Sequence, residues 1–166
     1  MKRWFVRLGW LALLAAAVFW GWGYFFPNPE HVIRKELVQL AQVASIAPNE
    51  APLTKLSKTQ KLLGFFADDA QISLDVPGRS IRTFRGHEDL QQMALGARSM
   101  LNSLKVNFVD VAVTVAPDKL SAVADLTATA SLPGEKIPEV QELEFHFKKM
   151  DRDWLIQRVD FVKTLR

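Results

Sequence analysis

The feature that most constrains this chain is an uncharged, almost wholly apolar stretch that begins at Leu8 and ends at Phe26. A helix of roughly 20 apolar residues is long enough to cross the hydrocarbon core of a bilayer. A buried core helix is the competing structure, but the rest of the chain is not apolar enough to surround a helix that is hydrophobic on every side. We therefore expect a single transmembrane helix over residues 8–26.

The charges on either side of this stretch predict its orientation. Lys2, Arg3 and Arg7 precede it, whereas the first charged residue after it is Glu30. Basic residues next to a transmembrane helix stay on the cytoplasmic side. We expect residues 1–7 to form a cytoplasmic tail, with the anchor in the inner (cytoplasmic) membrane and the following domain outside or periplasmic.

A cleaved signal peptide is the alternative interpretation of the same stretch. Ala15, Ala16 and Ala17 offer the small residues that a signal peptidase requires. Cleavage there would leave an N-terminus rich in Phe, Trp and Tyr, which would be poorly soluble. This consequence favours an uncleaved anchor.

The charge balance of the remaining chain excludes one class of partner. The chain has 21 Lys and Arg and 18 Asp and Glu, and three of the basic residues but none of the acidic ones precede residue 27. Residues 27–166 are therefore formally neutral, so the high isoelectric point reflects membrane topology and not a nucleic-acid surface. Their length suits one domain, and the absence of Cys excludes disulfides and thiolate chemistry.

Two segments have apolar residues at clear helical spacing. Residues 32–47 place Ile33, Leu37 and Leu40 on one face, and a later helix is expected from about Glu88 to Leu101. Between them, a second helix is predicted to start at a cap formed by Thr54 or Ser57 and to end near Asp68 and Asp69. Its expected inward residues are Leu56, Leu63 and Phe66.

The remaining segments alternate with the period of strands. A short strand around Ile72 and Leu74 and a return strand over residues 80–85 are expected, followed by long strands within residues 106–115, 120–130, 143–147 and 154–160. In the first long strand, Val109, Val111, Val113 and Val115 are expected on one face. Short turns between the long strands require an antiparallel meander. The predicted fold class is α+β, with about three helices packed on a curved, mainly antiparallel sheet.

This order of elements resembles the nuclear transport factor 2-like superfamily, also called SnoaL-like or cystatin-like α+β cones. Three stretches carry the resemblance: residues 63–70 (LGFFADDA), residues 84–90 (FRGHEDL) and residues 153–156 (DWLI). The resemblance covers residues 30–166 and implies a pocket between the sheet and the helices. It also implies that such a protein is either an isomerase, dehydratase or cyclase, or a non-catalytic binder of a ligand or protein, because this fold serves all of these functions.

Five residues are candidates for a pocket: Asp125, His146, Trp154, Arg158 and Asp160. Alternation places Arg158 and Asp160 on the face of Trp154 and Ile156, which would be partly internal. His146 is expected on the opposite, solvated face of its strand. No complete catalytic set is visible, although Asp125, His146 or Asp160 remains an alternative general base.

Other site classes lack support in the sequence. Three scattered His residues and no Cys give no recognised spacing for metal ligands, and no cofactor motif is present. Arg79, Arg82 and Arg85 form a basic cluster that suits either anionic headgroups or, more simply, a charged edge strand.

These observations predict a membrane-anchored domain that binds a small apolar ligand or a protein partner. The bilayer, contacted by residues 8–26, makes a lipid-like ligand the natural expectation, and a homodimer is compatible with the sequence. One alternative is a subunit of an inner-membrane assembly, because the layout resembles that of a component of type IV secretion machines. The other is an isomerase- or dehydratase-like enzyme with an acid–base residue in the cone.

Overall fold

The structure is a computed structural model that describes residues 28–74, 82–135 and 137–162. The predicted anchor and Arg79 of the basic cluster lie outside these described residues. Within the described part of the chain, no helix combines the length and the apolar character needed to cross a membrane.

The first described helix, α2 (Pro29–Ala44), begins and ends about three residues earlier than the sequence pattern predicted. Asn28 caps it by accepting a hydrogen bond from the backbone N–H of Glu30, and Pro29 occupies the first turn, where a missing N–H costs nothing. Its residues at helical spacing, Ile33, Leu37, Leu40 and Ala41, are buried as expected.

The second helix, α3 (Pro52–Leu63), corrects the predicted capping and ending. Its N-cap is Ala51, and Thr54 and Ser57 lie inside the helix because Pro52 already provides a favourable first position. Leu56 is exposed rather than inward, while Thr59 and Leu63 are buried. The helix does not continue to the two acidic residues: β1 (Phe66–Leu74) begins before them, so Asp68 and Asp69 lie within a strand.

In the part of the chain that the structure describes, six strands form one sheet in the order β2-β1-β6-β5-β4-β3. The remaining elements are β2 (Arg82–Arg85), α4 (Gly86–Met100), β3 (Lys105–Val115), β4 (Ser121–Ser131), β5 (Glu139–Met150) and β6 (Asp153–Phe161). The pair β1–β6 is parallel and the other neighbours are antiparallel, which confirms the predicted mainly antiparallel sheet and its meander. Gly86 joins β2 to α4 with φ of 72°, a conformation that side chains with a Cβ rarely adopt.

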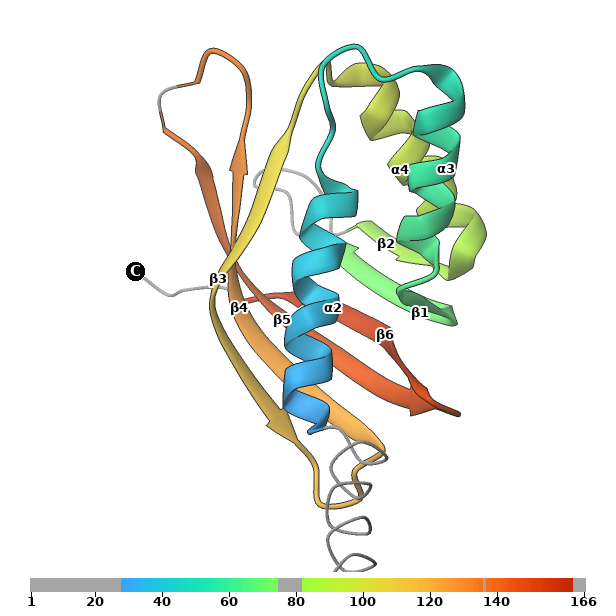
Figure 1. Cartoon of the computed structure of the whole chain (residues 1–166), viewed down its shortest axis with the longest axis vertical. Helices are drawn as coiled ribbons and strands as arrows, with labels where there is room; N and C mark the ends of the chain where they lie inside the picture. Colours follow the sequence, from blue (N-terminus) through green and yellow to red (C-terminus); the bar gives the residue numbers. More distant parts are fainter. Residues whose placement is uncertain (1–27, 75–81, 136, 163–166) are drawn as a thin grey trace, which may run out of the picture.

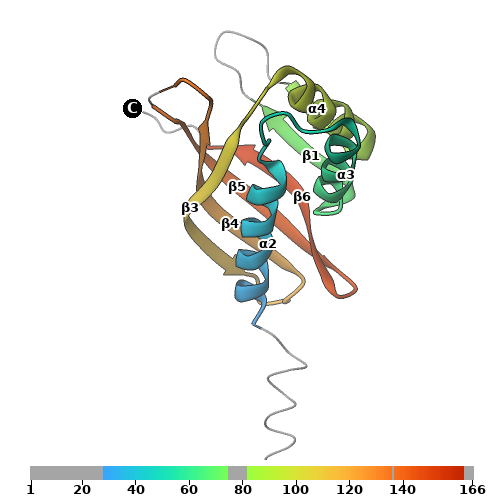
Figure 2. The ribbon, with the colours of Figure 1, turned by 45° about the horizontal axis from the view of Figure 1, so that its top comes forward.

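The described helices cover one face of this sheet, with α2 crossing the meander and α3 beside α4 near β1 (Figures 1 and 2). Core side chains from both layers pack together between them, including Ile33, Phe145, Phe147, Trp154 and Ile156. The expected α+β architecture is therefore observed. Trp154 is 3% exposed and Ile156 1% exposed, which confirms that their face of the last strand is internal.

A β-bulge bends β3 and changes which residues face the core. The register with β4 shifts between Val109 and Ala112, and Asp110 has φ of 53°. An extra residue reverses the alternation of faces. Val109 is consequently 43% exposed, whereas Val111 packs against the core, so the prediction that these two residues share a face is wrong.

A second irregularity reverses the alternation in β6. His146 pairs with Arg158 but Phe147 pairs with Ile156, which leaves Gln157 as an extra residue. Ile156 and Val159 are both buried, so Arg158 and Asp160 lie on the opposite face from Trp154 and Ile156. The prediction of an internal Arg–Asp pair is therefore wrong, because strict alternation does not hold through a bulge.

Candidate functional site

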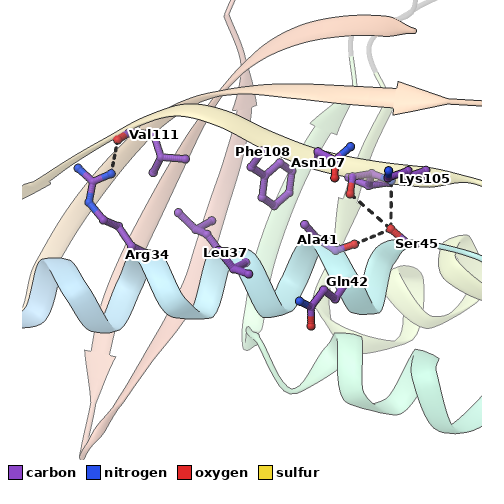
Figure 3. A pocket seen from close by; sticks show the side chains of 11 residues that line it. Arg34, Leu37, Ala41, Gln42, Ser45, Lys105, Asn107, Phe108 and Val111 are labelled. Carbon is purple, nitrogen blue, oxygen red and sulfur yellow. Dashed lines mark hydrogen bonds between the residues drawn. The ribbon is translucent and has the colours of Figure 1, made fainter.

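A groove of about 450 Å³ runs between α2 and β3. Figure 3 shows its two walls, the helix on one side and the bent strand on the other. The lining residues are Arg34, Leu37, Val38, Ala41, Gln42 and Ser45 from the helix side, and Lys105, Val106, Asn107, Phe108 and Val111 from the strand. These residues give the groove a mostly apolar surface.

The base of the groove is continuous with the hydrophobic core. Leu37 and Ala41 are buried on α2, and Phe108 packs edge-on against Phe145 with ring centroids 5.8 Å apart. Val38, by contrast, is 58% exposed at the rim. The helical lining from Arg34 to Ser45 extends over roughly 16 Å, at about 1.5 Å per residue. The groove is therefore elongated, with a fixed apolar base and an open rim.

The charged groups that line the groove are both basic. Arg34 lies toward one end and Lys105 toward the other (Figure 3). No acidic side chain occurs among the described residues of this lining. Arg34 donates a hydrogen bond to the carbonyl of Val111, which ties the helix to the strand just after the bulge. The groove thus combines an apolar centre with positive charge at both ends.

Backbone pairing closes part of the edge of β3 beside the groove. Ile46 exchanges two backbone hydrogen bonds with Leu104, at N···O distances of 2.8 and 3.0 Å. The Ser45 hydroxyl accepts a hydrogen bond of 3.0 Å from the backbone N–H of Val106. Together with Arg34, these contacts occupy groups that an added strand would need. The groove therefore favours side-chain contact with a ligand over β-strand addition.

An ion cluster that the sequence analysis did not predict lies at the C-terminal end of α2. Arg98 on α4 is 2% exposed, forms an ion pair with Glu50, and donates to the carbonyls of Val43 and Ser45. Glu50 also pairs with Lys58 of α3. The available signal was the spacing of Leu90, Ala94 and Arg98, which places Arg98 on the buried face of its helix.

None of the five residues selected from sequence lines the groove. Trp154 lies in the core, where its backbone N–H donates a hydrogen bond to the Glu36 carboxyl of α2. Burial and the negative charge of Asp153 raise the pKa of Glu36 to about 7, against the lowering effect of that hydrogen bond. The other four residues lie on the face of the sheet that the helices leave uncovered.

On this uncovered face the strands bring several of these residues together. His146 Nε2 lies 2.7 Å from Glu144 Oε1 and 3.1 Å from Asp160 Oδ2. Arg158 Nε lies 2.6 Å from the same Asp160 oxygen. Asp125 is exposed and stands in register with Glu144 on the neighbouring strand. The expectation that no metal site exists rested on the spacing of residues along the chain, which cannot show neighbours on paired strands. In the structure, three potential ligand atoms of Glu144, His146 and Asp160 lie within 4.8 Å of one another.

A second hollow adjoins this cluster. It has a volume of about 370 Å³ and is lined by Asp69, Gln71, His146, Gln157 and Arg158. Arg85 of the edge strand β2 pairs with Gln71 of β1. Arg85 is exposed, as expected for a charged edge strand. Arg82 lies on the same strand, and the third member of the predicted basic cluster, Arg79, falls outside the described residues.

Comparison with known proteins identifies the fold alone. No protein-family profile matches the chain, and no curated protein sequence is detectably similar to it. Among solved structures, yeast UBP3-associated protein BRE5 superposes with a TM-score of 0.61 at 12% identity, covering 84% of this chain and all of that one. Aln2 from a Streptomyces species superposes with a TM-score of 0.63 at 12% identity, covering 83% of this chain and 94% of that one.

A third structure connects these similarities to a named fold. An NTF2-like protein with a cystatin-like fold from Novosphingobium aromaticivorans superposes with a TM-score of 0.57 at 17% identity, covering 77% of this chain and 79% of that one. At such identities, similarity establishes architecture and not activity. The domain therefore has the NTF2-like, cystatin-like α+β fold that its sequence resembled.

Proposed function

We propose that this domain binds an elongated, apolar molecule that carries an anionic group, and that the groove between α2 and β3 is the binding site. The observation that carries the proposal is the groove itself, an apolar channel beside an intact core. Its volume of about 450 Å³ falls within the usual range of small-molecule sites, roughly 300–1,000 Å³.

The charges at the groove favour an anionic group on the ligand. Arg34 and Lys105 are the ionisable residues among its described lining, and both are cations. A carboxylate or phosphate at either end would gain a charge-assisted hydrogen bond while its apolar part lies on Leu37, Ala41 and Phe108. An uncharged ligand of the same length would lose that interaction.

A membrane location would supply such ligands. We propose that residues 8–26 anchor the protein in the inner membrane with its N-terminus inside, as the flanking charges indicate. Because α2 begins at Pro29, three residues after Phe26, the end of the groove at Arg34 would then stay close to the bilayer. A fatty acid or an anionic lipid is the natural ligand for a site so placed.

The arrangement of the other candidate residues supports binding over catalysis in the cone. Asp125, His146 and Asp160, each considered as a general base, lie on the sheet face opposite the helices. The apolar groove contains no acid–base pair among its described lining residues. Membership of a protein assembly remains the alternative that a negative ligand experiment would favour.

Native mass spectrometry of the full chain purified from membranes tests this proposal. We expect a co-purifying anionic lipid or fatty acid that is reduced in Arg34→Gln. Lys35→Gln is the matched control, since Lys35 is an exposed cation of the same helix outside the groove. An unliganded wild-type protein, with stoichiometric protein partners in its place, would support the assembly alternative.

The orientation has a separate test. A reporter that is active only outside the cytoplasm should be active when fused after Arg166. A cytoplasmic reporter that is active at that position would reject the orientation, and release of the protein by carbonate extraction would reject the anchor.

A further inference from the structure

We propose that Glu144, His146 and Asp160 bind a divalent transition-metal ion, with Zn²⁺ or Mn²⁺ as the fitting class, on the uncovered face of the sheet. The three residues come from adjacent antiparallel strands, β5 and β6, and are partly buried. This inference is independent of the groove, which lies on the opposite face between α2 and β3.

The spacing of the donor atoms fits a metal centre. The imidazole Nε2 lies 2.7 Å from a Glu144 oxygen and 3.1 Å from an Asp160 oxygen. A metal ion with bonds of about 2.0–2.2 Å holds adjacent ligand atoms roughly 3–3.5 Å apart. The three ligand atoms already lie within 4.8 Å of one another, so the site needs only side-chain rotations of Glu144 and Asp160 to reach such spacings.

Hydrogen bonding alone cannot satisfy the contacts of this imidazole nitrogen. Besides the two carboxylates, Arg158 Nη2 lies 3.1 Å from His146 Nε2. A ring nitrogen carries either one proton or one lone pair. As an N–H it can donate to the carboxylates but then faces the Arg158 donor, and with a lone pair it can accept from Arg158 but then faces two carboxylates. A cation between the three donors would accept the lone pair of His146 and satisfy both carboxylates at once.

The charge pattern around the cluster also calls for a cation. Asp125, Glu144 and Asp160 stand directly opposite one another on three adjacent strands. Like charges in such cross-strand positions destabilise a sheet. Among the described Lys and Arg side chains, Arg158 forms an ion pair with one of these three carboxylates, that of Asp160. A divalent ion at Glu144 and Asp160 would remove most of the remaining repulsion.

The adjoining hollow leaves room for further ligands of the ion. His146 and Arg158 line it together with Asp69, Gln71 and Gln157, and its volume is about 370 Å³. Three protein donors with open positions leave a metal accessible to water or to a small polar molecule. One imidazole and two carboxylates suit Zn²⁺ or Mn²⁺ better than Ca²⁺, which prefers six to eight oxygen ligands.

Isothermal titration calorimetry of the full chain in detergent, with ZnCl₂, MnCl₂ and CaCl₂, tests the proposal. We expect one Zn²⁺ or Mn²⁺ site, with affinity weakened by about tenfold or more in His146→Ala, Glu144→Gln and Asp160→Asn. His31→Ala is the matched control, because His31 is exposed on α2 and should leave binding unchanged. Absence of a transition-metal site in the wild type, or equal affinity in wild type and His146→Ala, would overturn the proposal.

Arg158 provides a second and distinguishing variant. Because its guanidinium competes with a cation for Asp160, Arg158→Gln should bind Zn²⁺ as tightly as the wild type or more tightly. Circular dichroism checks that each variant is folded. Loss of the ion from folded Arg158→Gln would show that the cluster is a hydrogen-bonded ion network, and would overturn the metal assignment. A Zn²⁺-displaceable Co²⁺ absorption band should appear in the wild type, and its absence there would contradict the same assignment.

Discussion

The guanidinium Nη1 of Arg98 lies 2.9 Å from a carboxylate oxygen of Glu50, and both side chains are at most 3% exposed. This pair joins α4 to the loop that follows α2. Since Arg98 also donates to the carbonyls of Val43 and Ser45, it fixes the end of the helix that forms one wall of the groove. Burial alone would raise the pKa of Glu50, but hydrogen bonds from Lys58 and Ala47 and the charges of Arg98 and Lys58 lower it.

Removal of Arg98 should therefore destabilise the domain. Arg98→Ala removes one of the two cations that pair with the buried Glu50 carboxylate, as well as the donor to the carbonyls of Val43 and Ser45. The free energy of unfolding should fall by about 3 kcal/mol, because these buried acceptors lose a charged partner. Arg152→Ala, at an exposed turn, should change it by less than about 0.5 kcal/mol. Chemical denaturation followed by circular dichroism compares the two, and similar small effects would show that the pair is dispensable.

Glu36 should make stability depend on pH in the opposite sense to Glu50. Its pKa rises from 4.5 to about 7 on folding, because burial and Asp153 disfavour its charge more than the Trp154 N–H favours it. The folded state therefore binds the proton more tightly, so the contribution of Glu36 to stability is greatest below pH 4.5 and is lost as the pH rises to about 7.

The isosteric variant Glu36→Gln tests this sign. Above pH 7 it should raise the free energy of unfolding by roughly 1–2 kcal/mol, a value discounted for partial exposure of the side chain. Near pH 4 the variant and the wild type should differ little. Denaturation curves across this range provide the measurement, and an equal effect of the substitution at both ends would contradict the account.

Trp154 should contribute strongly to the stability of the described core. It is 3% exposed between β6 and the helices. Trp154→Ala should lower the free energy of unfolding by about 3–5 kcal/mol. Ile137→Ala is a suitable control, because Ile137 is 81% exposed. A thermal melting temperature that hardly changes in Trp154→Ala would place this residue outside the cooperative core.

The bulge at Asp110 offers a test of how β3 is bent. With φ of 53°, this position disfavours a β-branched side chain, so Asp110→Val should cost about 1–2 kcal/mol of stability. Asp110→Gly should be close to neutral, since glycine adopts this conformation without a steric penalty. Equal stability of the two variants would mean that the strand is not held in the bulged geometry.

Periodicity predicted the parts of the fold that follow one period throughout. The stripe of Ile33, Leu37 and Leu40 on α2 and the alternation that predicted a strand within residues 143–147 are both confirmed. The failures occur where one residue is inserted into a strand. Bulges at Asp110 and Gln157 reverse the faces that follow them, and a local pattern gives no sign of the partner strand that sets the register.

The candidate sites were less predictable because they depend on tertiary proximity. Arg34 and Phe108 are far apart in the chain and meet only where α2 crosses the bent β3. In the same way, Glu144 and Asp160 become neighbours through strand pairing. His146 was correctly placed on the outer face, but its two carboxylate contacts could not be read from residues on its own strand.

The central claim is that the α2–β3 groove holds an anionic, lipid-like molecule, and site-mapped photo-crosslinking in membranes tests it most directly. Membranes that contain the full chain are irradiated with a diazirine-bearing fatty acid, and the adducts are located by mass spectrometry. We expect adducts at groove residues such as Val38, Gln42 and Phe108. They should be lost in Gln42→Trp, which fills the groove, but retained in Gln39→Trp, an exposed position of the same helix outside it. Labelling spread over the domain surface, or equal labelling in the two variants, would contradict the account.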